Sequence, residues 1–148
     1  MSLREKAQQR AKDVIHNRAE DARKEAEKQL AAAELQAAAL WPDVIAAIDA
    51  AADRGEFSAP LPAIYPREVV LHQSMAIGST KVLIDSTNVQ TALAPHTSAG
   101  VILIRKLVKE GFSVRVVLTE LHDEKDRPLV QIDAHFSPEP EDHPMMGR

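Results

Sequence analysis

Apolar residues recur every three or four positions along the first forty residues of the chain. From Ser2 to about Leu40 there is neither proline nor glycine, and most residues are strong helix formers. This pattern predicts one long amphipathic helix over residues 2–40, about 57 Å in length at roughly 1.5 Å per residue. Its apolar stripe runs through Leu3, Ala7, Ala11, Ile15, Ala22, Ala26, Leu30, Ala33 and Ala37.

The stripe consists largely of alanine, which accounts for sixteen of the first 56 residues. Small side chains let two helix backbones approach closely, but each alanine buries little area, so an isolated pair of such helices is weak. We therefore expect the stripe to be the interface of a homo-oligomer. Two alternatives stay open: the helix projects as a lever or folds back on its own domain, or it binds a foreign partner.

A second helix is expected over about residues 43–54. Pro42 suits the first turn of a helix, because its missing N–H is not needed there. An apolar face then begins at Val44, and Gly55 ends the segment. Trp41 is expected to fix the corner between the two helices.

After Gly55 the pattern changes from helical to extended. Residues 57–66 contain three of the nine prolines, which predicts an edge strand or an extended connection. Residues 68–77 and 81–86 are rich in strand formers on either side of a turn, which predicts a hairpin. Residues 87–97 fit a short helical turn as well as a strand.

The clearest unit comes last in the chain. Residues 101–108 predict a heavily apolar helix that ends at Gly111. Alternating apolar residues over 112–118 and 130–136 predict two antiparallel strands, which a polar turn joins. Arg115 and Asp133 would point outward from these strands, where they could pair.

Together these elements predict an α+β fold, with a long N-terminal amphipathic helix and a small domain that has a mostly antiparallel sheet and one buried helix. The expected division is a helical arm over 1–55, an α/β domain over 56–136 and a disordered tail over 137–148. In the tail, three prolines and three acids occur without periodicity.

Composition excludes several classes of function. The chain has no cysteine, so disulfides, thiolate catalysis and cysteine-ligated zinc are ruled out. It lacks the apolar core of a signal peptide and a run of about 18 apolar residues, so no membrane partner is expected and the simplest location is the cytoplasm. With a net charge of −4, nucleic acid is not favoured as a partner. The nearest to a basic patch is formed by Arg4, Lys6, Arg10, Lys12 and Arg18.

No catalytic, cofactor or metal site is predicted. The segment from Gly78 to Lys81 lacks the spacing of a phosphate loop, and the six histidines lack the spacings of zinc ligands. The one candidate ligand site is the start of the last helix, where free N–H groups could receive an anion. The competing interpretation, which we prefer, is that Thr97 or Ser98 caps that helix. The residues of this candidate anion site are Thr97, Ser98, Ala99 and Gly100.

Two stretches carry a resemblance to a known group of proteins. They read Ile-Asp-Ala-Ala-Ala-Asp-Arg-Gly at 48–55 and Leu-Val-Lys-Glu-Gly-Phe-Ser-Val at 107–114. In their order along the chain, over 44–57 and 98–119, they resemble small structural and accessory proteins of tailed bacteriophages. The resemblance implies a virion or assembly component, in which many copies associate by symmetry with one another and with other virion proteins. It implies no catalytic residue.

We therefore expect a non-enzymatic structural or interaction protein that self-associates through its N-terminal helix. The resemblance would make it a head, neck or tail component of a phage virion. The alternative is a small ligand- or nucleic-acid-binding regulator that uses the helix start at 96–100 or the basic residues within 4–18. An enzyme ranks third, because no pattern brings catalytic side chains together.

Overall fold

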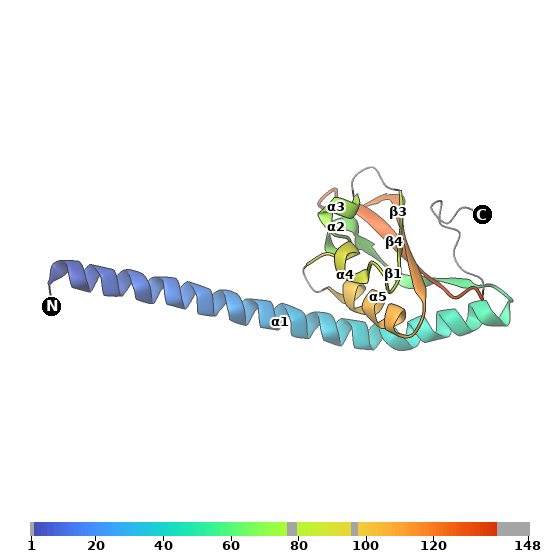
Figure 1. The fold of residues 1–148 in the computed structure, drawn as a ribbon, viewed down its shortest axis with the longest axis horizontal. Helices are drawn as coiled ribbons and strands as arrows, with labels where there is room; N and C mark the ends of the chain where they lie inside the picture. The colour runs from blue at the N-terminus through green and yellow to red at the C-terminus, as the bar shows by residue number, and fades with distance from the viewer. Residues whose placement is uncertain (1, 77–79, 96–97, 139–148) are drawn as a thin grey trace.

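A computed structural model describes residues 2–76, 80–95 and 98–138 of the chain (Figure 1). The elements in chain order are α1 (Leu3–Asp53), β1 (Ser58–Pro66), α2 (Arg67–Val70), α3 (Gln73–Ala76), β2 (Lys81–Ile84), α4 (Val89–Ala92), α5 (Ala99–Lys109), β3 (Ser113–His122) and β4 (Pro128–His135). A long N-terminal helix leads into a small antiparallel sheet with a few helices, so the α+β prediction is confirmed. Of the predicted tail, residues 139–148 lie outside the described residues.

Helix α1 begins and ends where the sequence provides the required residues. The Ser2 hydroxyl accepts the N–H of Glu5, and the Glu5 carboxylate accepts the N–H of Ser2, which makes a capping box. At the other end Gly55 has a φ of 76°, a left-handed conformation that glycine adopts at little cost. Between these signals the helix runs without interruption for 51 residues.

The predicted division of this region into helices over 2–40 and 43–54 is therefore wrong. Pro42 lies inside α1, where it removes one helical hydrogen bond, and the helix bends near this position (Figure 1). The helix continues because the turn after Pro42 is held by tertiary packing: the side chain of Val44 is completely buried against the domain. Trp41, which was expected to fix a corner between two helices, is half-buried within the continuous helix beside its bend.

The strands described here form one antiparallel sheet in the order β1-β4-β3-β2. Strand β1 lies at an edge, as its prolines predict, because a proline has no N–H to donate to a second neighbouring strand. Strands β3 and β4 form the predicted hairpin, and Arg115 lies opposite Asp133 in its register.

The hairpin predicted over 68–77 and 81–86 is wrong. The short helices α2 and α3 occupy the first of these segments, and β2 pairs with β3 instead. Val70 is buried in α2, whereas the buried Leu71 is extended and forms an isolated antiparallel bridge with Leu93, so the segment makes no continuous strand. Of the ambiguous segment 87–97, residues 89–92 form the short helix α4.

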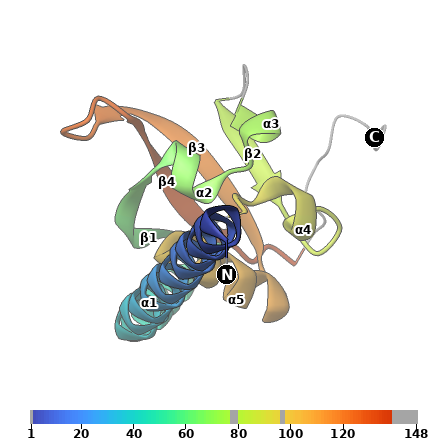
Figure 2. The ribbon, with the colours of Figure 1, turned by 90° about the vertical axis from the view of Figure 1, so that its left-hand side faces the viewer.

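One face of the sheet carries the core of the protein. Helix α5 and the C-terminal part of α1 lie side by side and pack against the sheet (Figure 2). The largest fully buried side chains come from α5, β2, β3 and β4, and include Leu103, Ile104, Leu107, Ile84, Val116 and Ile132. Val44 of α1 belongs to the same cluster. The C-terminal part of α1 thus packs in the core of the domain.

Candidate interaction surface

The N-terminal part of α1 projects from the domain as a free helix (Figure 1). Every residue from 2 to 32 is exposed except Glu20, which is half-buried. We call residues 2–32 the arm; at roughly 1.5 Å per residue it is about 46 Å long. Leu3 and Ile15 are 85% and 66% exposed, so the arm carries large apolar side chains in contact with solvent.

The predicted stripe is divided between two environments. Seven of its nine residues lie on the arm and are exposed: Leu3, Ala7, Ala11, Ile15, Ala22, Ala26 and Leu30. The other two, Ala33 and Ala37, are buried against the rest of the chain. Both are therefore covered by the chain itself and are not free for a partner, and at Ala37 the methyl side chain lets α5 approach α1 closely. The alternative that the helix folds back on its domain is correct for this end of the stripe alone.

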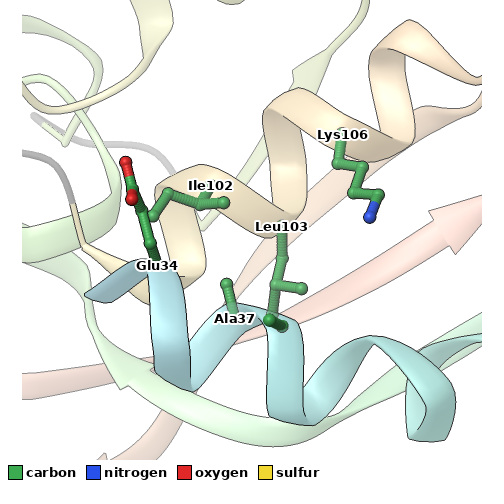
Figure 3. Close-up of a pocket in the computed structure, with 6 residues that line it drawn as sticks. Glu34, Ala37, Ile102, Leu103 and Lys106 are labelled. Carbon is green, nitrogen blue, oxygen red and sulfur yellow. The ribbon is translucent and has the colours of Figure 1, made fainter. Parts of the chain in front are cut away.

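A small pocket lies between α1 and α5, where Ala37 faces Leu103 (Figure 3). Its volume is about 130 Å³, and its lining consists of Glu34, Ala37, Ala38, Ile102, Leu103 and Lys106. Glu34 and Lys106 stand at opposite ends of it (Figure 3). The Lys106 ammonium lies 4.3 Å from the centroid of the Trp41 ring, a cation–π contact that ties α5 to the bend of α1. The pocket walls are mostly aliphatic, so it is a packing gap that carries no chemistry.

A larger hollow opens beside the bend, at the other end of α5. It measures about 350 Å³ and is lined by Trp41, Ile45, Ile48, Asp49, Glu110 and Phe112. We call it the junction groove. Its floor is apolar, whereas its two ionisable residues, Asp49 and Glu110, are both acidic and exposed. Such a groove suits an apolar segment that also carries positive charge.

Charge is distributed unevenly along α1. Residues 3–18, the basic segment, contain five Lys or Arg against two acids, a net charge of +3. Residues 37–53, the acidic segment, contain three Asp and no Lys or Arg, a net charge of −3. The acidic segment was not predicted, although the absence of basic residues over seventeen positions was the available signal. In the middle of the helix, Arg23 forms ion pairs with Glu20 and Glu27, which raise the pKa of Arg23.

The start of α5, where an anion site was considered, is capped and packed. The Ser98 hydroxyl accepts the N–H of Val101 and donates to the carbonyl of Val69 at 2.9 Å. Ala99 and Gly100 are buried, and a Cβ at Gly100 would lie 3.1 Å from Val70. Ser98 thus caps the helix, as the competing interpretation predicts, whereas Thr97 lies outside the described residues.

Arg127 forms an ion-pair cluster that links two parts of the domain. Arg127 donates to Asp123 at 2.7 Å and to Glu68 at 2.9 Å, which fastens the β3–β4 turn to α2. The backbone N–H and the side chain of Arg127, together with the N–H of Lys125, hold the pKa of Asp123 below its usual value. Across residues 2–76, 80–95 and 98–138, no three His, Asp or Glu side chains are placed to hold a metal ion together.

One stretch of α1 is long and apolar enough, by length and composition, to cross a membrane, contrary to the expectation that the chain has no such stretch. A single helix of this kind is weak evidence for a membrane span, because a core helix of a water-soluble protein and a signal sequence near the N-terminus pass the same criterion. Of the residues in this stretch, 17% are buried.

Comparison with known proteins found no family model, no curated protein and no solved structure that matches this chain. The resemblance to phage proteins therefore stays a prediction. The role of the chain is inferred from the placement of its own residues, of which the arm and the junction groove are the most distinctive.

Proposed function

We propose that this protein is a non-enzymatic structural or interaction protein that self-associates through the arm. The observation that carries the proposal is the exposure of the arm, whose large apolar residues, Leu3 and Ile15 among them, pack against no other element in the described part of the chain. A single helix of about 30 residues owes most of its stability in water to packing of its apolar face. A second copy would supply that packing.

The arm suits a symmetric assembly better than a small-molecule site. Its alanines allow close helix packing but supply little energy each, whereas Leu3, Val14 and Ile15 add roughly 1.5–3 kcal/mol each when fully buried. A stable interface of ordinary size buries about 1,200–2,000 Å² in total. The arm would therefore have to pair over most of its length.

Light scattering of the full chain at tens of micromolar tests this proposal. We expect a dimer or larger oligomer that becomes a monomer when residues 2–30 are removed, with the circular dichroism of the domain retained. As a matched pair without a change of charge, Val14→Asn should weaken association strongly, whereas Gln9→Asn, about 140° away around the same helix, should leave it nearly unchanged. A full chain that stays monomeric would contradict the proposal.

The finer assignment, a head, neck or tail component of a tailed-phage virion, is also a proposal. It is supported by the local pattern of the resemblance, in which a helix ends at glycine before a strand, as α1 does at Gly55 and α5 at Gly111. Neighbouring genes that encode virion proteins would support it, and a genome without any would count against it.

The second candidate is a nucleic-acid-binding regulator, which the exposed basic segment favours. Its residues Arg4, Lys6, Arg10, Lys12 and Arg18 are all exposed on the arm. A gel shift at about 50 mM salt that disappears at higher salt would support this candidate. Absence of a shift at about 50 mM would remove it.

A further inference from the structure

We propose that two copies of this chain pair antiparallel along α1, so that the basic segment of each lies along the acidic segment of the other and its tip reaches the partner's junction groove. This inference rests on the proposed function, because it specifies the surface and the orientation of the self-association. Residues on the outward side of the acidic segment become part of the interface, which the sequence pattern alone does not indicate.

Charge decides the orientation. In a parallel pair, the segment of net charge +3 would lie beside its own copy, and the segment of net charge −3 would do the same. In an antiparallel pair, each positive segment meets a negative one. The middle of α1 contains both positive and negative side chains, and its Arg23 is already paired within the helix. The charges at the two ends of the helix therefore set the preference for the antiparallel orientation.

The apolar surfaces of the two segments also match. Exposed apolar residues in both segments lie three, four or seven positions apart, which places each set on one face of the helix. In the arm they are Leu3, Ala7 and Val14, and near the bend they are Leu35, Ala38, Pro42 and Ile45. Leu35 is 73% exposed and Ile45 is 43% exposed. Alternating spacings of three and four are those of a helix–helix seam.

Geometry excludes the chain's own arm as the occupant of its junction groove. Leu3 and Ile45 belong to the same continuous helix, and 42 residues separate them by roughly 63 Å at about 1.5 Å per residue. Figure 1 shows the N-terminus at the end of α1 far from the domain. The arm of a second copy is not held at this distance and can reach the groove.

A register that places Ala7 opposite Ile45 brings the two surfaces together. Val14 then lies opposite Ala38, and Arg10 lies close to Asp43. Each contact occurs twice about a two-fold axis, so the assembly closes as a dimer and does not propagate into a fibre. The apolar tip would cover the floor of the groove, while its positive charges would face Asp49 and Glu110.

Cross-linking in the full chain tests the orientation, because the native sequence contains no cysteine. Ala7→Cys and Ala46→Cys chains are mixed and treated with a short bis-maleimide that spans one helical turn, about 5.4 Å. We expect hetero-cross-linked dimers in the mixture and little cross-linking of either variant alone. A mixture of Ala7→Cys with Glu124→Cys, an exposed position in the β3–β4 turn, measures random collision.

Charge reversal supplies an independent measurement. Arg10→Asp and Asp43→Arg should each weaken the dimer by about five-fold or more, whereas one chain with both changes should return to within about three-fold of the native affinity. Lys81→Glu, an exposed reversal on β2, is the matched control and should have little effect. The affinity of the native dimer should also fall as salt is raised.

The outcomes separate this inference from the function on which it rests. Dimers in which Ala7→Cys cross-links mainly to itself, with no rescue by the double reversal, would overturn the antiparallel arrangement and leave self-association intact. A chain that is monomeric at all concentrations tested, or a dimer that survives removal of residues 2–30, would overturn the proposed function as well.

Discussion

Helix α1 consists of the free arm and of residues 33–53, which pack on the domain and which we call the core segment. This division predicts that two substitutions in the same helix have different effects on the free energy of unfolding. Val44→Ala removes two methyl groups from a side chain that is 0% exposed. Lost transfer free energy contributes about 1.6 kcal/mol at roughly 0.8 kcal/mol per methyl group. The space left behind contributes about 1 kcal/mol more. The higher helix propensity of alanine offsets about 0.5 kcal/mol of this loss. We therefore expect the free energy of unfolding to fall by about 2 kcal/mol.

Ile15→Ala is the matched substitution on the arm. Ile15 is 66% exposed, so little burial within the chain is lost, and the free energy of unfolding of the monomer should change by less than about 0.5 kcal/mol. Both variants would be measured by urea denaturation at two protein concentrations, because self-association makes apparent stability depend on concentration. With a slope of about 2 kcal/mol/M, Val44→Ala should lower the midpoint by about 1 M. A loss below about 0.5 kcal/mol for Val44→Ala, or equal losses for both variants, would refute the packing of α1 on the domain.

Three further substitutions test single contacts. Ser98→Ala removes the cap of α5 and should cost about 1 kcal/mol in thermal unfolding followed by circular dichroism. Asp123 has a lowered pKa in the folded state, so its contribution to stability is present above the unfolded-state pKa of about 4 and is lost as pH falls through the lower folded value. Asp123→Asn should therefore lower the melting temperature at pH 7 and flatten its fall in acid, and an unchanged pH profile would count against the Arg127 contacts. Lys106→Met removes the charge over Trp41, the one tryptophan of the chain, and should change its fluorescence and cost about 0.5–1 kcal/mol; an unaltered emission spectrum would contradict the contact.

Much of the fold follows from local sequence patterns. The capping box at Ser2, the glycines that end α1 and α5, and the alternation of β3 and β4 are all readable along the chain, and the structure has each of them. These features are determined by residues close together in sequence, so propensity and periodicity are sufficient to predict them. The edge position of β1 follows likewise from its prolines.

Where the predictions failed, contacts between distant residues decided the outcome. Pro42 is a reasonable helix start by local rules, yet the burial of Val44 against the sheet carries the helix through it. The apolar residues near Val70 fit a strand or two short helices equally well, and in the structure their extended pairing is limited to one bridge, between Leu71 and the distant Leu93.

The candidate surface shows the same division. By itself the sequence determined that the N-terminal region is a long amphipathic helix with an alanine stripe, because composition and a period of three to four residues depend on nothing outside that segment. It could not determine which part of the stripe is free, since Ala33 and Ala37 look no different from Ala22 and Ala26 until α5 packs against them. Only the tertiary structure separated the arm from the core segment and formed the junction groove, because both depend on the chain returning, some sixty residues later, to the same face of α1.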